Sequence, residues 1–137
     1  MKKILLMLVV CVVTIGGNNL VVNAADYNPA EEIESSLYVN TKSVSTHIAF
    51  SGNTANCSVS VVGVSNTGSI RGTATLYDDT VGKVVTSWHI GSSNCICKSS
   101  KSVGVTKGHS YRLVFNGTVC RAGGLCEQIS GSATAHN

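Results

Sequence analysis

The sequence predicts an all-β protein built as a two-layer sandwich or a small barrel. From Leu37 onward, short runs of alternating apolar and polar residues are separated by Gly, Asn and Asp turns. This part of the chain is rich in Ser, Thr, Gly, Asn and Val, which suit pleated, half-buried strands. No apolar spacing of a helical period appears in it. Together these observations predict seven or eight short antiparallel strands.

The first 25 residues have the pattern of a secretory signal. Lys2 and Lys3 precede an apolar run, 4–15, which is followed by a polar stretch with small residues, 18–25. Val22-Asn23-Ala24 is the best cleavage box, and cleavage one residue later fits nearly as well. The apolar run is too short to span a bilayer. We therefore expect a signal helix that is removed and a secreted, extracellular protein without a stable membrane anchor.

Residues 26–36 form an acidic leader. They contain the single proline, Pro29, and four of the seven acidic residues. Asn28 is suited to cap a helix that begins at Pro29, but the segment is too short to be stable alone. We expect a mobile leader or one short helical turn, followed by a single domain over 37–137. Of the ten basic residues, two leave with the signal, so this domain carries eight positive and three negative groups, a mild basic excess.

The first strands of the domain have clear inward faces. Residues 37–51 provide one or two opening strands. The run 54–61 turns Ala55, Cys57, Val59 and Val61 to one face, and the run 69–77 does the same with Ile70, Ala74 and Leu76.

The later strands are less regular. The run 83–90 places Val84, Trp88 and Ile90 on one face, and we expect Trp88 in the core. Strict alternation over 93–105 would turn Lys101 inward, so we expect a bulge or break near 98–102. The runs 109–120 and 125–135 complete the sheets, the first with Tyr111, Leu113 and Phe115 inward.

Two resemblances refine the fold. The segment Thr106-Lys107-Gly108-His109-Ser110-Tyr111-Arg112 resembles the turn before the sixth strand of immunoglobulin-like and fibronectin type III-like sandwiches. In those folds a Gly turn precedes a tyrosine that bonds upstream backbone. The chain also resembles small secreted proteins of Gram-positive bacteria without assigned function. That resemblance lies in the order Ala55-x-Cys57-x-Val59-x-Val61, Leu76, Ser87-Trp88, Val105-x-x-Gly108-x-x-Tyr111-Arg112, Glu127. These resemblances imply an antiparallel immunoglobulin-like sandwich, with Gly108 and Tyr111 in structural roles, and imply no activity.

Five of the six cysteines remain after removal of the signal, which contains Cys11. In a sandwich, the expected strand directions place Cys95, Cys97, Cys120 and Cys126 at one end. Cys57 then lies alone in the core as a free buried thiol. Two disulfides among the four are the interpretation we favour, because small exported domains gain stability from them. Cys120 and Cys126 could pair across a hairpin or link to Cys95 and Cys97, so three pairings stay open.

Two other interpretations of these cysteines are weaker. A Cys₄ zinc site, with His89 as a possible substitute ligand, lacks the usual spacing of zinc ligands. A thiol catalyst formed by Cys97 with His89 or His109 lacks a flanking signature.

No catalytic, cofactor-binding or metal-binding motif appears in the sequence. We expect a non-catalytic binding or surface-associated module whose loops at the cysteine-rich end contact an extracellular protein, a glycan or a cell-wall target. No interleaving of basic and aromatic residues suggests nucleic acid. The alternatives are a small secreted toxin or antimicrobial protein and, with less support, a zinc- or thiol-dependent protein.

Overall fold

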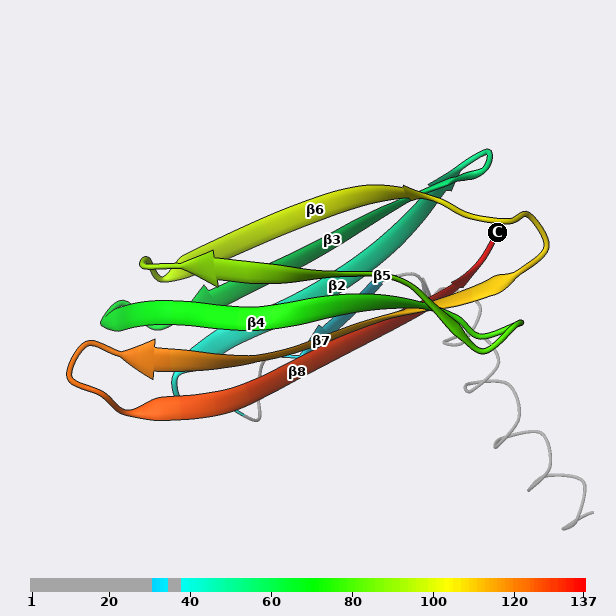
Figure 1. Cartoon of the computed structure of the whole chain (residues 1–137). Coiled ribbons are helices and arrows are strands. Elements are labelled where there is room, and N and C mark those ends of the chain that lie inside the picture. The colour runs from blue at the N-terminus through cyan, green and yellow to red at the C-terminus, as the bar shows by residue number, and fades with distance from the viewer. Residues whose placement is uncertain (1–30, 35–37) are drawn as a thin grey trace, which may run out of the picture.

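A computed structural model describes residues 31–34 and 38–137 of the 137-residue chain (Figure 1). Within these ranges, eight strands form two antiparallel sheets of four strands each, and no helix occurs. Sheet A has the order β1-β2-β3-β6, and sheet B has the order β5-β4-β7-β8. The predicted all-β, antiparallel class is confirmed. The signal predicted over 1–25 lies outside the described residues.

The strands follow one another through short turns. In chain order they are β1 (Glu31–Glu34), β2 (Thr41–Ser51), β3 (Thr54–Gly63), β4 (Thr67–Asp78), β5 (Lys83–Ser92), β6 (Ile96–Gly104), β7 (Ser110–Arg121) and β8 (Cys126–His136).

The core lies between the two sheets and is built by alternation along the central strands. Every second residue of β3 is buried, and on β7 the buried residues are Tyr111, Leu113, Phe115 and Val119, with the alternation interrupted at Gly117. Sheet A contributes Val44, Ile48, Ala55, Cys57, Val59, Val61 and Cys97, and sheet B contributes Ile70, Ala74, Leu76, Ile90, Tyr111, Leu113, Phe115, Val119, Ile129 and Ala133.

Two glycines face each other at the centre of sheet B. Gly72 of β4 pairs with Gly117 of β7, and the ring of Phe115 lies against both. A Cβ at Gly117 would lie 2.6 Å from Cζ of Phe115, and a Cβ at Gly72 would also collide with that ring. The absence of side chains at both positions therefore makes room for the ring of Phe115.

The acidic leader differs from our expectation. Residues 31–34 form β1 and pair with β2 between Val44 and His47, instead of forming a mobile segment or a helical turn. The strand satisfies backbone groups along part of the otherwise open edge of β2. Residues 26–30 and 35–36 of the predicted leader lie outside the described residues.

The prediction for β5 is wrong at Val84. A register shift between Leu76 and Tyr77 of β4 leaves Val85 as an extra residue on β5 and pairs Tyr77 with Val84. Val84 therefore lies on the outer face and is 58% exposed, while Val85 packs against the core. A one-residue bulge reverses the facing of everything beyond it, which explains the error.

The bulge predicted near 98–102 is absent. The register between β3 and β6 runs without a shift from Thr54 to Val62, so Lys101 does turn to the inner face, opposite Cys57. Burial of its charge is avoided because β6 is an edge strand. The ammonium reaches the flank of the sandwich, where Nζ lies 5.8 Å from the centre of the Trp88 ring.

Candidate functional site at the disulfide-linked end

One end of the sandwich carries a disulfide within the β7–β8 hairpin. Cys120 and Cys126 pair directly, with their Cα atoms 4.0 Å apart, and form a disulfide. The next pair inside the turn is hydrogen bonded, because the amide of Arg121 donates to the carbonyl of Leu125 (2.8 Å). The cysteines therefore occupy a non-hydrogen-bonded position, where opposed side chains come closest. This is one of the pairings that the sequence left open.

Backbone hydrogen bonds join four segments at this end. The amide of Val64 donates to the carbonyl of Asn40, that of Gly63 to Cys95, and that of Ala122 to Asn66, at 2.9, 2.7 and 2.9 Å. These bonds connect the start of β2, the β3–β4 turn, the β5–β6 loop and the β7–β8 loop, which lie together at the same end in Figure 1. We call this region the disulfide-linked end.

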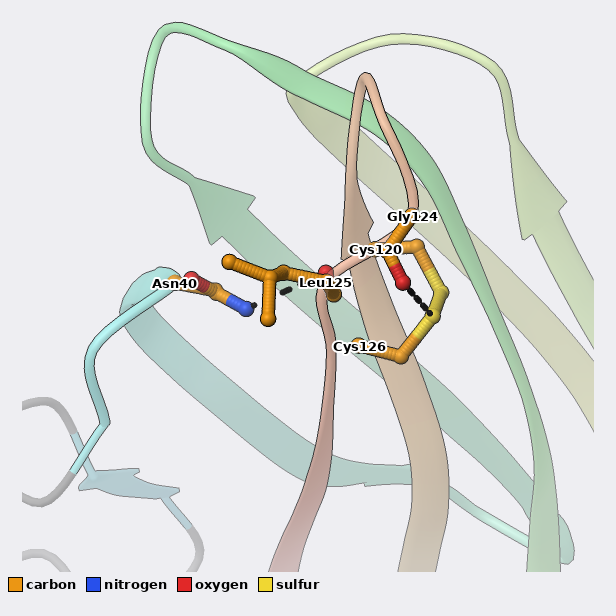
Figure 2. Close-up of a disulfide and its surroundings, with 5 residues drawn as sticks. All are labelled: Asn40, Cys120, Gly124, Leu125 and Cys126. Carbon is orange, nitrogen blue, oxygen red and sulfur yellow. Dashed lines mark hydrogen bonds between the residues drawn. A yellow bond between two sulfur atoms is a disulfide. The ribbon is translucent and has the colours of Figure 1, made fainter.

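Glu127 fixes the chain that enters β2. The amides of Val39 and Asn40 donate to its two carboxylate oxygens at 2.6 and 2.9 Å, and the Thr41 hydroxyl donates to Oε2 at 3.1 Å. Asn40 Nδ2 also donates to the carbonyl of Leu125 at 3.4 Å, beside the disulfide (Figure 2). The Glu127 carboxylate and the Asn40 side chain thus hold the entry to β2 against β8 and the β7–β8 loop.

Large apolar side chains are exposed at this end. Val39 is 75% exposed, Leu125 68% and Ile96 50%. Gly123 and Gly124 between the cysteines have positive φ angles and open space around them. The loop backbone is therefore shaped by residues that tolerate the left-handed region, and its apolar side chain at Leu125 points into solvent.

The second disulfide that the sequence led us to expect is absent. Cys57, Cys95 and Cys97 are free thiols. Once Cys120 and Cys126 are joined, only Cys95 and Cys97 remain at this end, and a bond between cysteines separated by one residue would be strained. Cys97 lies on the inner face opposite Val61, whereas Cys95 precedes the strand and is half-buried.

The environments of the buried thiols are apolar. Cys57 is 1% exposed, and burial raises its pKa to about 11. Burial also raises the pKa of Cys97. Both thiols are therefore held in the protonated, unreactive form at neutral pH.

Neither alternative chemistry for the cysteines is assembled in the described part of the chain. Two of the four proposed zinc ligands form the disulfide, and among residues 31–34 and 38–137 no group of three His, Cys, Asp or Glu side chains is placed to hold a metal. Cys97 faces inward on β6, His89 bonds Thr73 at an exposed position on β5, and His109 contacts Asp78 at the other end of the sandwich.

The opposite end is organised around Tyr111. Its hydroxyl accepts a hydrogen bond from the amide of Thr106 (2.7 Å) and donates to the carbonyl of the same residue (3.1 Å). Gly108, with φ of +83°, makes the turn between them. Tyr111 and Gly108 therefore close the turn between β6 and β7.

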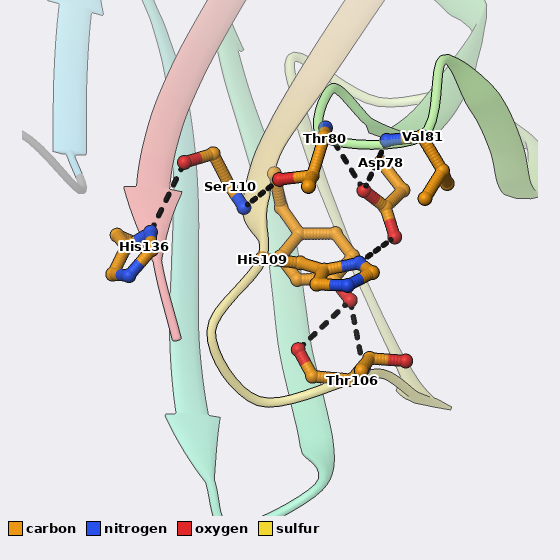
Figure 3. A network of polar contacts seen from close by, with 8 residues as sticks. Asp78, Thr80, Val81, Thr106, His109, Ser110 and His136 are labelled. Carbon is orange, nitrogen blue, oxygen red and sulfur yellow. Dashed lines mark hydrogen bonds and ion pairs between the residues drawn. The ribbon is translucent and has the colours of Figure 1, made fainter.

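Asp78 connects two turns at this end (Figure 3). Its Oδ1 accepts the amides of Thr80 and Val81, and its Oδ2 lies 2.7 Å from Nδ1 of His109. Burial acts to raise the pKa of Asp78, but the hydrogen bonds from His109 and Val81 outweigh it and lower the pKa. Asp78 is thus an ionised turn cap.

Asp79 links the same turn to Arg112 of β7. It accepts two hydrogen bonds from Arg112, at 3.0 and 3.1 Å, and these raise the pKa of Arg112. The guanidinium also lies over the ring of Tyr77, 4.5 Å from its centre. The two adjacent carboxylates therefore serve local structure.

The sequence analysis missed a serine–histidine contact beside this network. The hydroxyl of Ser110 and Nδ1 of His136 lie 3.0 Å apart and point toward each other (Figure 3). Both residues line an open pocket of about 340 Å³. Nucleophile activation requires a third group that orients the histidine. The carboxylate that lines the pocket, Asp79, is engaged by Arg112 instead. No sequence signal joins residues 110 and 136, because their proximity depends on the pairing of β7 with β8.

Trp88 closes the flank between β5 and β6. Its indole Nε1 donates to the hydroxyl of Ser99 (3.0 Å), and the half-buried ring packs against the core. The residue therefore lies where the two sheets meet at their open edges.

The comparisons with known proteins gave no relative. No protein-family model, curated protein or solved structure matches the chain. Among the described residues, no helix is long and apolar enough to cross a membrane.

Proposed function

We propose that this chain is an exported, non-catalytic binding module with immunoglobulin-like architecture, whose contact site is the disulfide-linked end. The signal pattern of residues 1–25 supports export, and the sequence resemblance supports a Gram-positive source. The observation that carries the contact site is the joining of four segments by three backbone hydrogen bonds and the carboxylate of Glu127, with the β7–β8 hairpin among them closed by the disulfide.

Strand order supports the immunoglobulin-like part of the proposal. The neighbours β2-β3-β6 correspond to strands A, B and E of such sandwiches, and β4-β7-β8 to strands C, F and G, with β5 beside β4 in the position of C′. Tyr111 near the start of β7 bonds backbone five residues upstream, which is the position of a tyrosine corner. In this family the loops at one end of the sandwich commonly form the recognition surface.

The rigidity of the site supports recognition over catalysis. A surface whose loops are already fixed loses little conformational entropy on binding. The carboxylates of the described domain are engaged in structure: Asp78 with His109, Asp79 with Arg112, and Glu127 with the entry to β2. What the disulfide-linked end presents to solvent is instead apolar surface at Val39, Leu125 and Ile96.

The test uses the protein recovered from the medium of a secreting Gram-positive host, with its intact mass recorded. A mass that begins at residue 25 or 26 supports export with signal removal, whereas retention of residues 1–24 contradicts it. The labelled protein is then incubated with intact Gram-positive cells and with purified peptidoglycan.

Three variants locate the contact site. We expect Cys120→Ser/Cys126→Ser and Leu125→Ser to weaken cell binding by about tenfold while the fold, followed by circular dichroism, is retained. Val81→Ser is the matched control, because Val81 is a 51% exposed apolar residue in the turn at the opposite end. Equal binding by all variants would count against the proposed site.

A further inference from the structure

The two outermost strands of sheet A carry opposite charges. The order β1-β2-β3-β6 means that, within the described residues, β1 and β6 are each paired on one side only. Three of the four residues of β1 (Glu31–Glu34) are glutamates, whereas β6 carries Lys98 and Lys101 and no carboxylate. One edge of the sheet is therefore acidic and the other is basic.

The strands around the basic edge leave its charge uncompensated. Its partner β3 contains no charged residue, and β5, which lies beside β6 at this flank, contains Lys83 and His89 but no Asp or Glu. In the described part of the chain, neither Lys98 nor Lys101 lies within ion-pair distance of a carboxylate. The β6 edge therefore keeps both positive charges.

The acidic edge keeps a net negative charge. Its residues pair with positions 44–47 of β2, and Lys42 is the one lysine or arginine on that strand. The two strands together thus carry three negative charges and one positive charge. The neighbouring strand β8 adds Glu127 and His136 at this flank, so it contributes no lysine or arginine to offset the glutamates.

We propose that the β6 edge of one molecule pairs with the β1 edge of a second copy, so that sheet A continues from copy to copy. Every neighbouring pair in sheet A is antiparallel, and β1 and β6 therefore run in opposite directions. A second copy in the same orientation would bring its β1 antiparallel to β6. Backbone hydrogen bonds would then extend the ladder, and opposite charges on the facing strands would stabilise it. This contact uses the edges of sheet A and does not depend on the contact site proposed above.

The charges also select against other pairings of these edges. Two β6 edges would place lysines against lysines, and two β1 edges would place glutamates against glutamates, which is destabilising. Lysines on an edge strand commonly prevent indiscriminate pairing. The ladder between β3 and β6 has no register shift, so no bulge distorts the outer backbone of β6. The lysines therefore leave an acidic strand as the partner of a regular edge.

The assembly that follows is an open chain. The two edges are different surfaces, so their contact is heterologous, and every oligomer keeps one free edge at each end. Because β1 is only four residues long, each contact is small. Small interfaces are weak and transient, and the chains should therefore form only at high protein concentration.

Sedimentation velocity of the protein recovered from the medium tests this assembly. We expect oligomers that grow with protein concentration in about 0.01 M salt, where the Debye length is about 30 Å, and monomers in about 1 M salt, where it is about 3 Å. A monomer at every concentration in low salt would overturn the proposal, and so would oligomers that do not respond to salt. This measurement requires no variant.

Charge reversal at each edge then identifies the contact. Lys98→Glu/Lys101→Glu makes both edges acidic, and Glu31→Lys/Glu32→Lys/Glu34→Lys makes both edges basic. Each variant alone should show an apparent dissociation constant at least about tenfold higher than the wild type. An equimolar mixture should associate again, because its edges are complementary. If both variants are folded by circular dichroism and their mixture stays monomeric, the two edges do not meet.

Arg71→Glu/Lys107→Glu is the matched control for the basic edge. It changes the net charge by the same amount as Lys98→Glu/Lys101→Glu, but Arg71 is exposed on β4 of sheet B and Lys107 is exposed in the turn between β6 and β7. Its apparent dissociation constant should stay within about twofold of the wild type. An equal loss of association in the two variants would assign the effect to net charge and overturn the role of β6.

Discussion

Removal of the Tyr111 hydroxyl tests whether the corner between β6 and β7 stabilises the domain as the geometry implies. Tyr111 is 1% exposed, and its hydroxyl makes two hydrogen bonds to the backbone of Thr106. Tyr111→Phe keeps the ring and leaves an amide and a carbonyl without their partner. At about 1 kcal/mol for each bond, the loss is about 2 kcal/mol. For a domain of this size, that corresponds to a fall in melting temperature of about 9 °C.

Tyr38 provides a matched control with the same chemistry. Its hydroxyl also bonds both the amide and the carbonyl of one residue, Ser130, at 3.1 and 3.3 Å, but in an exposed position at the edge of β8. Water can replace it there, so Tyr38→Phe should cost less than about 0.5 kcal/mol. Thermal unfolding followed by circular dichroism gives both values. If the two variants lose equal stability, or if Tyr111→Phe loses less than Tyr38→Phe, burial is not the source of the effect and the reasoning is refuted.

Three further predictions concern the thiols, the Asp78 turn and the edge of sheet A. In native protein, iodoacetamide at pH 8 should label half-buried Cys95 much faster than buried Cys57 and Cys97, and peptide mass mapping would measure the labelling at each cysteine. Rapid labelling of Cys57 would contradict its burial and its pKa of about 11. Folding lowers the pKa of Asp78, so its negative charge stabilises the native state. This stabilisation is complete when the pH is above the ordinary Asp pKa, and it is lost as the pH falls through the lowered pKa of the folded state. Urea unfolding should therefore show a stability gap between wild type and Asp78→Asn that is constant from pH 7 to about pH 5 and narrows below about pH 4, whereas a gap that widens in acid would reverse the assignment. Finally, Lys101→Val removes the inward charge from an edge strand, so this variant should self-associate more than the wild type in sedimentation velocity. The control is Lys98→Val, which changes an outward lysine on the same strand and should self-associate less than Lys101→Val. Equal self-association of the two variants would mean that the inward position has no special role.

The sequence predicts the central strands well because their burial is decided locally. Ala55, Cys57 and Val59 alternate with polar neighbours on β3, and Tyr111 and Leu113 flank the polar Arg112 on β7. A strand covered on one face and solvated on the other must have this period, so its inward side can be recognised without tertiary information.

The edges could not be predicted in this way. Alternation alone correctly turns Lys101 inward, but a buried charge is so costly that we expected a bulge instead. What makes the inward lysine tolerable is the open flank beside Trp88, and this depends on how the two sheets meet. Val84 was misplaced for the opposite reason, because a one-residue bulge leaves no mark in a run of similar residues.

The candidate site was predicted only in outline. The convergence of Cys120 and Cys126 follows from hairpin pairing, which is local. The role of Glu127 depends on its contact with Val39 and Asn40. These two residues lie just before β2, whereas Glu127 lies on β8, the last strand. Contacts between such distant positions have no periodic signature in a single sequence.

The packing of Phe115 over Gly72 and Gly117 has a consequence for evolutionary divergence. A Cβ at Gly72 would also lie 2.5 Å from the carbonyl oxygen of Asn116, and one at Gly117 would lie 2.5 Å from the carbonyl oxygen of Arg71. A smaller residue in place of Phe115 would therefore not make room at either position, because the backbone of the neighbouring strands would still have to move. We expect both glycines to persist in distant homologues even where the ring at position 115 is replaced.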